Sequence, residues 1–395
     1  MYHIEPTPSV FAGLQRQAPD PLLSLIALYR DDPRPDKIDL GVGVYRDAEG
    51  ATPVFAAVKA AELALLHNQK TKAYLGPEGD IGFLEGLTPV VFGDTARPDD
   101  LVSVQTPGGT GALRLAAELV ATGRPRSRVW MGTPSWPIHP GIFEKARLEV
   151  RAIPYFDQVS QVLDYDRYLN ELGAAQPGDV ALLHGACHNP TGADPSFSQW
   201  SEIADLLQRR GVVPLVDLAY QGLGAGLDED AAGLRLLMER CETVIVAQSC
   251  DKNFGLYRER TGALFVRTRP SQQTVVRSNI LQLARCAWSM PPDHGAAVVR
   301  IILETESLDL GWRAELAGVR GRLNALRSDL SASAPQLQSL GDRRGLFALL
   351  PLTSGAVEAL RANHGVYMAG SGRINLAGLN EATLPVFANA LAAVL

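Results

Sequence analysis

The sequence is poor in lysine and cysteine and has no excess of positive charge. Six lysines leave 31 arginines among its 37 basic residues, against 43 acidic residues, and the net charge is −6. Such a balance argues against nucleic acid or an acidic membrane surface as a partner. The four cysteines show no C-x-x-C spacing, which argues against a zinc or redox motif. They suit a reduced, cytoplasmic environment better than a disulfide framework.

Long apolar runs are missing as well. No segment reaches about 18 uninterrupted apolar residues, so no transmembrane helix is expected. The first twenty residues have neither a basic start nor an apolar core, so no signal peptide is expected. With 46% apolar content over 395 residues, the chain is predicted to be a cytoplasmic globular protein with a sizeable core and no membrane partner.

What the sequence does contain is a regular alternation of helical and strand patterns. Apolar runs rich in β-branched residues alternate with helix-length segments, which is typical of an α/β fold with a mainly parallel sheet covered by helices on both faces. Strands are expected at residues 101–106, 128–133, 150–155, 179–187, 212–220, 243–249 and 262–268.

The pattern changes near residue 300, which predicts two domains. A long helix is expected at 309–332, followed by short strands at 345–351 and 373–377 and a terminal helix. We expect a large domain of residues 51–300. A smaller α+β domain is expected to combine residues 301–395 with residues 1–50, which hold an N-terminal arm and a short helix. Ligands of such sheets bind beyond the carboxyl ends of the strands.

Two glycine-rich stretches are candidates for contact with a ligand. "TPGGTG" at 106–111 joins an expected strand to an expected helix, where glycines allow close approach and free N–H groups favour a phosphate. The alternative is that it is only a turn. "GLGAGL" at 222–227 resembles a dinucleotide-binding fingerprint, but no suitable apolar helix follows it, so we interpret it as a loop.

"HGACHNPTG" at 184–192 follows another expected strand. Its Asn-Pro step forces Asn189 out of helical geometry and fixes a turn at the strand end, where the side-chain amide could contact a ligand oxygen. His184 and His188 are four residues apart, but a strand-to-turn context does not place them on one face. We therefore expect no metal site there, and interpret both as core histidines or as support for other site residues.

A carboxylate and a lysine follow on later strands. Asp217 lies inside the apolar run "VPLVDLAY", three residues before Tyr220, and a buried carboxylate needs a partner. The alternative role of Asp217 is a structural ion pair with an arginine. Lys252 follows the run "TVIVAQS", with Arg260 eight residues later. The alternative for Lys252 is a solvated loop residue, whereas a lysine buried near cations can become a nucleophilic amine.

Taken together, these features match one cofactor. An anion site, a strand-end asparagine, a buried aspartate near a tyrosine, and a strand-end lysine followed by an arginine occur in order on successive strands. Pyridoxal 5'-phosphate (PLP) needs an anion site for its phosphate, a carboxylate against its pyridine nitrogen, donors for its phenolic oxygen and an amine for a Schiff base. The sequence therefore predicts a PLP site.

The sequence resembles the aspartate and aromatic amino-acid aminotransferases, which are class I PLP-dependent enzymes of the aspartate aminotransferase fold. The resemblance runs nearly end to end. It rests on the ordered motifs "KIDLGVGVYRD", "TKAYLG", "TPGGTGALR", "PSWPIH", "HNPTGADP", "DLAYQG", "KNFGLYRERTG", "PPDHGA" and "SGRINLAG".

The resemblance implies a role for each cofactor-binding residue. Lys252 is expected to form the Schiff base and shuttle a proton, and Asp217 to pair with the pyridine nitrogen. Asn189 and Tyr220 are expected to contact the phenolic oxygen, and Trp136 to stack on the ring. The phosphate is expected to be bound by Gly108, Gly109, Thr110, Ser249, Arg260 and Tyr74 of the partner subunit.

The resemblance also implies how substrates are held. Arg373 is expected to bind the α-carboxylate through its guanidinium fork. Arg285 is expected to reach the distal carboxylate from the partner subunit, which implies a homodimer with shared active sites; the alternative is a surface arginine. Gly43 lets backbone approach the substrate, and Trp136 and Asn189 also line its site.

Three residues depart from the family pattern. Asp251 stands immediately before Lys252 where members of the family usually have serine, and we expect its carboxylate to face away from the site. Ala73 and Met290 replace polar residues common in strict aspartate enzymes. Both changes are expected to make the edge of the pocket more apolar and more tolerant of aromatic substrates.

The resulting prediction is a homodimeric aminotransferase. It is expected to move the amino group of aspartate, aromatic amino acids, or both, to 2-oxoglutarate by a ping-pong mechanism through Lys252. One alternative is a PLP-dependent aspartate β-decarboxylase, a lyase on the same scaffold. A second is a PLP-binding regulatory domain, although no basic helix-turn-helix segment is visible beside it.

Overall fold

A seven-stranded sheet forms the centre of the protein. The computed structural model describes residues 9–16 and 21–395. The strand order is β2-β10-β9-β8-β7-β3-β4, and β10 alone runs antiparallel to its two neighbours. The strands are β2 (Leu101–Pro107), β3 (Arg128–Thr133), β4 (Glu149–Pro154), β7 (Val180–His184), β8 (Val213–Leu218), β9 (Val244–Ser249) and β10 (Thr261–Arg267). The predicted α/β class with a mainly parallel sheet is confirmed.

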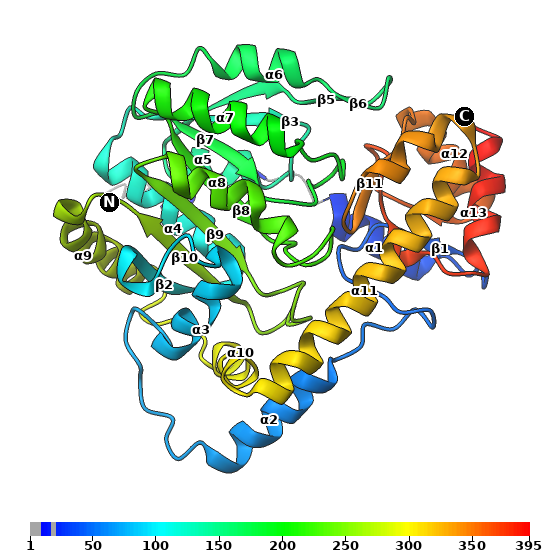
Figure 1. Cartoon of the computed structure of the whole chain (residues 1–395). Coiled ribbons are helices and arrows are strands. Elements are labelled where there is room, and N and C mark those ends of the chain that lie inside the picture. Colours follow the sequence, from blue (N-terminus) through cyan, green and yellow to red (C-terminus); the bar gives the residue numbers. More distant parts are fainter. Residues whose placement is uncertain (1–8, 17–20) are drawn as a thin grey trace, which may run out of the picture.

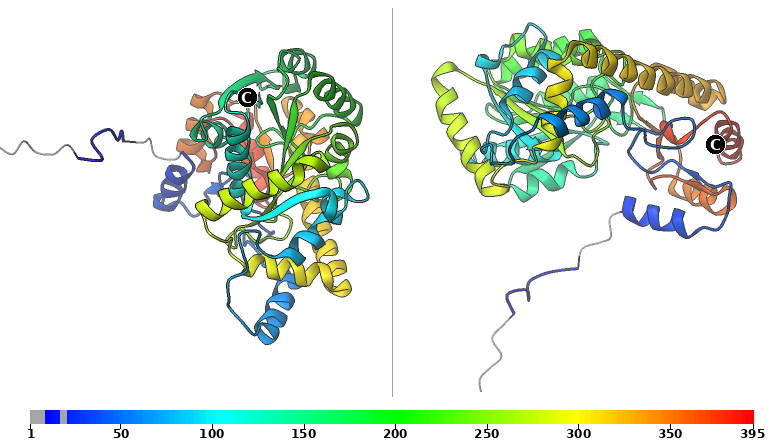
Figure 2. Two further views of the ribbon diagram at one scale, coloured as in Figure 1. Left: turned by 90° about the vertical axis from the view of Figure 1, so that its left-hand side faces the viewer. Right: turned by 90° about the horizontal axis from the view of Figure 1, so that it is seen from below.

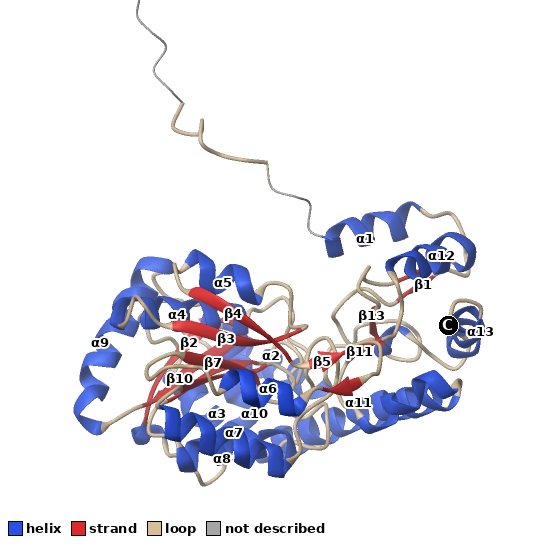
Figure 3. Cartoon of the chain, turned by 90° about the horizontal axis from the view of Figure 1, so that it is seen from above, coloured by secondary structure: helices blue, strands red, loops and turns tan. Residues whose placement is uncertain are grey.

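Helices cover both faces of this sheet (Figure 3). Strand β9 explains why, because its side chains alternate between two apolar cores: Val244 and Val246 belong to one, Ile245 and Ala247 to the other. The second core is closed by α4 (Gly108–Gly123), α5 (His139–Lys145) and α9 (Pro270–Ala287). The first core is closed by α3 (Ile81–Phe92), α6 (Tyr165–Leu172), α7 (Phe197–Arg210), α8 (Ala232–Arg240) and α10 (His294–Glu304).

Two expected strands end earlier than the apolar pattern suggested. β7 ends at His184 rather than Cys187, and β8 ends at Leu218 rather than Tyr220. In the first case the chain turns sharply, and Cys187 adopts a positive φ of 54°, which is incompatible with a strand. The consequence is that Asp217 lies within a strand, whereas Asn189 and Tyr220 lie in the loops that follow.

A second group of elements lies beside the sheet (Figures 1 and 2). Segments from the first and last parts of the sequence meet there, because β1 (Ile38–Asp39) pairs in parallel with β12 (Val366–Tyr367). β11 (Phe347–Leu349) pairs antiparallel with β13 (Arg373–Asn375). The helices of this group are α1 (Pro21–Asp31), α12 (Ser354–His364) and α13 (Thr383–Ala392). The domain boundaries near residues 50 and 300 stay a prediction, and residues 1–8 and 17–20 of the expected arm lie outside the described residues.

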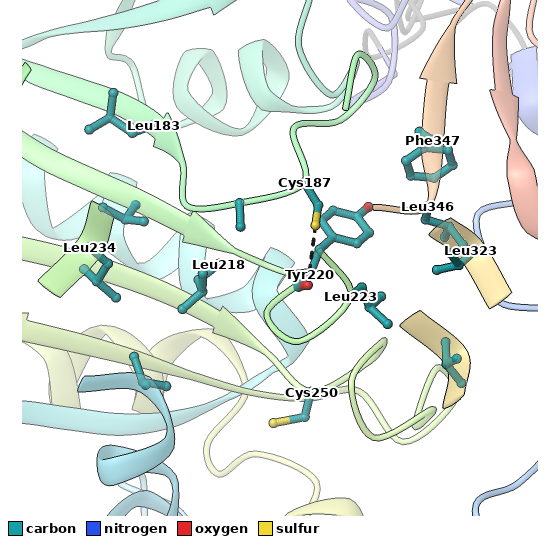
Figure 4. Close-up of a cluster of buried hydrophobic side chains, with 14 of the residues drawn as sticks. Leu183, Cys187, Leu218, Tyr220, Leu223, Leu234, Cys250, Leu323, Leu346 and Phe347 are labelled. Atoms are coloured by element: carbon teal, nitrogen blue, oxygen red, sulfur yellow. Dashed lines mark hydrogen bonds between the residues drawn. The ribbon is translucent and has the colours of Figure 1, made fainter. Parts of the chain in front are cut away.

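Helix α11 (Glu306–Ala332) runs from α10 and α2 (Ala56–Asn68) toward the small strands (Figure 1). Leu316, Val319 and Leu323 on its buried face join the same core as β11 and β13. Figure 4 shows part of this core at the ends of the sheet strands, with Phe347 near Tyr220 and Leu323 beside Leu346. The two groups of elements therefore share apolar contacts next to the carboxyl ends of the strands.

The remaining strands are β5 (Phe156–Asp157) and β6 (Val162–Leu163), which pair antiparallel. Among the helices of the described residues, none is long and apolar enough to cross a lipid bilayer. All four cysteines lie in the described part of the chain and are free; Cys187, Cys241 and Cys250 are buried.

Candidate active site

A pocket of about 810 Å³, which includes open solvent at its mouth, lies beyond the carboxyl ends of the strands. The ends of β2, β3, β7, β8 and β9 all point to this edge. Because β10 is reversed, its first residues reach the same edge. Most of the predicted site residues line the pocket: Gly43, Gly109, Thr110, Trp136, Asn189, Asp217, Tyr220, Ser249, Lys252, Arg260 and Arg373.

One end of the pocket is built to hold an anion. Helix α4 begins at Gly108, so its first N–H groups and the positive end of its dipole face the pocket. Gly108 has a φ of +68°, and a Cβ there would lie 2.6 Å from Nη2 of Arg260. Glycine is therefore required for the guanidinium to approach the start of the helix. The "TPGGTG" stretch is thus more than a turn, since it adjoins a cation at the edge of the pocket.

Asp251 lies in the same end of the pocket, and the expectation that it faces away is wrong. Its side chain is 5% exposed, accepts a hydrogen bond from Nη1 of Arg260, and has Oδ2 3.9 Å from Nζ of Lys252. The backbone N–H of Asp251 donates to Oγ of Ser249 at 3.2 Å. The carboxylate is drawn inward because two cations, Lys252 and Arg260, lie on the pocket side.

The side chain of Lys252 is directed into the pocket rather than into solvent. Only 18% of it is exposed, and Nζ lies 5.6 Å from the centre of the Tyr220 ring. Burial lowers the pKa of Lys252, and the charge of Arg260 lowers it further, while Asp251 and Asp217 oppose the shift. A lysine in this environment offers an amine that loses its proton more readily than a solvated one. The solvated-loop alternative for Lys252 is therefore wrong.

Asp217 is paired with a histidine and not with an arginine. Nε2 of His139 lies 2.9 Å from Oδ2 of Asp217. Burial alone raises the pKa of Asp217, but the hydrogen bond and charge of His139, with smaller contributions from His184 and Lys252, hold the pKa below its usual range. Asp217 therefore presents an ionised carboxylate at the wall of the pocket.

A chain of hydrogen bonds supports His139. Oγ of Ser135 lies 2.9 Å from Nδ1 of His139 and 2.9 Å from Nε2 of His184. The backbone N–H of Asn189 donates to Nδ1 of His184 at 3.4 Å. Every member donates once and accepts once if Nε2 carries the proton in both histidines. Burial and the charge of His139 lower the pKa of His184 to about 3, so His184 is neutral.

Asn189, Tyr220 and Arg373 form the opposite side of the pocket. Nδ2 of Asn189 donates to the Tyr220 hydroxyl at 3.3 Å, and Nη1 of Arg373 lies 3.5 Å from Oδ1 of Asn189. The Arg373 guanidinium lies 4.5 Å from the centre of the Phe347 ring, and its buried Nε has no hydrogen-bond partner. Arg373 lines the pocket, so its guanidinium presents a cation to an incoming carboxylate.

Several predicted residues do not meet in the pocket of this chain. Tyr74 is 91% exposed, and Arg285 is exposed on α9. Ala73 and Met290 do not line the pocket either. Tyr74 and Arg285 were expected to act from the partner subunit, whereas Ala73 and Met290 were expected at the edge of the pocket, and these expectations stay predictions. Gly108 lies against the guanidinium of Arg260, since a Cβ on Gly108 would be 2.6 Å from Nη2.

Sequence reasoning missed two residues: His139, which is buried behind Asp217, and Phe347, which lines the pocket. His139 carried no assigned role although it lies within the quoted motif "PSWPIH", because its contact with Asp217 spans 78 residues of sequence. Phe347 comes from β11 and packs edge-on against Tyr220 at 6.0 Å (Figure 4). Neither position has a spacing signal, since both contacts are made only when separate elements meet.

The pocket fits PLP by the chemistry of its donors. An ionised carboxylate, Asp217, suits a pyridinium nitrogen, and Lys252 offers an amine between it and the anion-binding end. Arg260 and the start of α4 suit a phosphate, although Asp251 shares that cation. When bound, this cofactor supplies an electron sink for negative charge at the substrate Cα.

Comparison with known proteins supports this chemistry. A family model described as aminotransferase class I and II matches residues 35–391. The chain is 53% identical over 378 residues to a tyrosine aminotransferase of Rhizobium meliloti, which covers 94% of this chain and 97% of the relative. It is 43% identical over 400 residues to an aspartate aminotransferase of Escherichia coli, covering 98% of this chain and 100% of the relative.

Solved structures agree. An aromatic amino acid aminotransferase with 3-indolebutyric acid has a TM-score of 0.94 at 42% identity, covering 97% of this chain and 99% of its own. An aromatic-amino-acid aminotransferase from Burkholderia pseudomallei, covalently bound to pyridoxal phosphate, has a TM-score of 0.95 at 36% identity, covering 98% of this chain and 100% of its own. The fold, the pocket and these relatives lead to one conclusion: the chain belongs to the class I and II aminotransferases and is a PLP-dependent enzyme.

Proposed function

We propose that this enzyme transfers the amino group of aspartate and of aromatic amino acids to 2-oxoglutarate by ping-pong exchange. The observation that carries the proposal is the convergence of Lys252, Asp217 and Arg373 on one pocket. Each supplies a different requirement of amino transfer: a base at the substrate Cα, a carboxylate at the cofactor nitrogen and a cation for the α-carboxylate.

The residues of the chain have distinct tasks in this reaction. Arg373 holds the α-carboxylate through its fork and so aims the Cα hydrogen at the amine of Lys252. Lys252 would act as the proton shuttle for that hydrogen, and its lowered pKa assists this role. Asp217, which stays ionised, would pair with the ring nitrogen of the cofactor. Asn189 and Tyr220 would contact its phenolic oxygen, and Trp136 would lie against its ring.

The phosphate end is assigned to the remaining predicted residues. Gly108, Gly109 and Thr110 offer backbone N–H groups, because they form the first turn of α4. Ser249, at the end of β9, and Arg260, directly before β10, complete the proposed phosphate site.

The substrate range is supported by the lining of the pocket. Trp136, Tyr220 and Phe347 give it aromatic walls, which suit an aromatic side chain. Arg285 is proposed to add a second guanidinium for the distal carboxylate of aspartate, glutamate and 2-oxoglutarate. The Rhizobium relative is named a tyrosine aminotransferase and the Escherichia coli relative an aspartate aminotransferase.

We further propose that the enzyme is a cytoplasmic homodimer with shared active sites. Support for the dimer comes from apolar side chains exposed on and after α2: Leu63, Leu66, Tyr74 and Leu75, at 59%, 75%, 91% and 49%. Such a patch is expected to be covered by another protein surface. A partner's Tyr74 and Arg285 would then complete each pocket. The four free cysteines support a reducing compartment.

The decarboxylase alternative has no support from the named relatives, which are aminotransferases. Product analysis separates the two reactions. Aspartate and 2-oxoglutarate give oxaloacetate and glutamate in amino transfer, whereas β-decarboxylation of aspartate gives alanine and carbon dioxide.

Replacement of Lys252 tests the proposed function. Wild-type protein is expected to absorb at roughly 360–430 nm through its bound cofactor, and borohydride reduction is expected to attach the cofactor to the peptide that contains Lys252. Lys252→Ala is expected to lose both the attachment and amino transfer. Lys145→Ala, which removes an exposed lysine at the end of α5, is the matched control and should keep both. Full turnover by Lys252→Ala would refute the proposal.

The substrate range is tested separately. We expect kcat/KM values for aspartate, tyrosine and phenylalanine, each with 2-oxoglutarate, to lie within about a hundredfold of one another, since differences of one apolar pocket contact are worth that much or less. A preference for aspartate over phenylalanine beyond that range would refute the broad specificity and leave an aspartate enzyme.

A further inference from the structure

The anion-binding end of the pocket already contains an anion. The Asp251 carboxylate is 5% exposed, pairs with Arg260 and lies near the start of α4; a Cβ on Gly108 would lie 3.4 Å from its Oδ2. Its other oxygen, Oδ1, is buried and has no hydrogen-bond partner. A buried, unpartnered carboxylate oxygen is costly, because an ionised group loses its hydration without compensation.

The groups around Asp251 are cationic or neutral. Arg260 and Lys252 face it as cations, whereas Tyr257 and the neighbouring Cys250 face it as neutral groups. The start of α4 contributes neutral Gly108, Gly109 and Thr110, whose backbone N–H groups favour an anion. The carboxylate thus has the same attractions as a phosphate would have at this place.

A phosphate group that enters this cradle meets two obstacles. Arg260 is already hydrogen-bonded to Asp251, so its donors must be shared. The phosphate dianion and the carboxylate also repel each other at hydrogen-bond distance, because both are negatively charged. A single proton between the two acids removes this repulsion and turns it into a hydrogen bond that also satisfies a carboxylate oxygen.

We propose that Asp251 couples cofactor binding to proton uptake: the cofactor phosphate binds together with one proton from solvent, held between a phosphate oxygen and the Asp251 carboxylate. The only bond change in this step is the transfer of a proton from solvent to an oxygen of this pair. The inference deepens the proposed function, since it concerns how the same pocket takes its cofactor. It makes retention of the cofactor weaker as the pH rises.

Binding of pyridoxamine 5'-phosphate to full-length, cofactor-free protein tests the coupling. This compound has an amine in place of the aldehyde, so it does not bond to Lys252. A phosphate monoester loses its second proton near pH ~6, and the wild-type dissociation constant is expected to rise about tenfold per pH unit above that. Pyridoxamine without phosphate corrects for the ring ionisations.

Two variants remove the charge at position 251. Asp251→Asn keeps the shape of the side chain and Asp251→Ser shortens it. Both are expected to bind pyridoxamine 5'-phosphate at least about tenfold more tightly than wild type at pH 8, with a flat pH dependence, and to bind pyridoxamine as wild type does. Weaker binding by both variants at every pH would overturn the proposal. Asp251 would then help to form the phosphate site rather than compete with the phosphate for Arg260.

A measurement on the wild type alone covers the case in which the variants do not fold. The ³¹P resonance of bound pyridoxamine 5'-phosphate is expected to stay at the position of the protonated phosphate, or to titrate, above pH 7. A bound phosphate that remains a dianion from pH 5.5 to 9, with pH-independent affinity, would overturn the inference. The proposed function would survive that result, since it fails only if Lys252→Ala keeps amino transfer.

Discussion

Nε2 of His139 lies 2.9 Å from Oδ2 of Asp217, and this bond sets the charge of the carboxylate at the pocket wall. An ionised carboxylate can only accept, so Nε2 carries the proton of this bond, and Ser135 lies 2.9 Å from the other ring nitrogen. His139 is fully buried and also contacts the rings of Trp136 and His184 edge-on. Asp217 thus remains ionised within an apolar sheet because His139 donates a hydrogen bond to it.

Replacement of His139 by alanine is expected to raise the pKa of Asp217. A hydrogen bond to a charged group contributes about 1.5–3 kcal/mol, which corresponds to about one to two pH units. As the pH is lowered, Asp217 should therefore become protonated, and activity should be lost, at a higher pH than in wild type. The acidic limb of the kcat profile is expected to move up by about one to two pH units.

His364→Ala, at the exposed end of α12, is the matched control and should leave the profile unchanged. An unshifted acidic limb in His139→Ala, with the protein folded, would contradict the role given to this hydrogen bond.

The amine of Lys252 provides a second prediction. Burial lowers its pKa, and the Asp251 carboxylate partly opposes that shift. Asp251→Asn removes the opposing charge and is expected to lower the pKa further. In cofactor-free protein, the midpoint for reaction of Lys252 with an acylating reagent, followed by mass spectrometry, should lie below the usual lysine range in wild type and lower still in the variant. A midpoint that rises in Asp251→Asn would contradict the geometry.

Arg373→Lys should separate substrate binding from cofactor binding. Lysine keeps the charge but loses the planar fork, so kcat/KM for every amino acid is expected to fall by about a hundredfold. The absorbance of the bound cofactor should not change, because Arg373 faces the substrate. Arg30→Lys, on a side chain that is 75% exposed, is the control. Loss of cofactor from Arg373→Lys would show that the assignment is wrong.

Subunit mixing tests the shared active site. Homodimers of Lys252→Ala and homodimers of Arg285→Ala are each expected to have little or no activity toward aspartate. After exchange of subunits, half of the dimers carry one intact pocket, so about a quarter of wild-type activity should return. A mixture of Lys252→Ala with Arg373→Ala should recover nothing, because both residues belong to the pocket of one chain. Equal recovery in the two mixtures would argue against sharing.

Trp312 on α11 is expected to hold the loop that carries Lys252. Its Nε1 donates to the carbonyl of Asn253 at 2.7 Å, and its ring stacks on Phe254 at 4.2 Å. Trp312→Phe should keep the stacking but lose the hydrogen bond, at about 1–3 kcal/mol of unfolding free energy. Trp312→Ala should cost about 3–5 kcal/mol.

Urea unfolding measures both costs. Phe197→Ala, which truncates a side chain that is 64% exposed, should change stability by less than about 0.5 kcal/mol. Trp312→Phe as stable as wild type would show that the Asn253 carbonyl does not depend on this donor.

The sequence predicts what depends on neighbours along the chain. Strand β9 and the lysine after it follow from an apolar β-branched run and its end, and the common edge follows from the parallel order of the strands. The direction of Asp251 could not be predicted, since it depends on Arg260 returning to the same edge on a reversed strand. The Trp312 contact could not be predicted either, because it joins elements 59 residues apart.

The antiparallel course of β10 has one more consequence. Lys252 and Arg260 lie at the two ends of a single connection between hydrogen-bonded strands, in which Gly262 pairs with Ser249. The pairing of β9 with β10 therefore sets the separation between the amine of Lys252 and the guanidinium of Arg260. A ligand that contacts both groups must have a length that matches this separation.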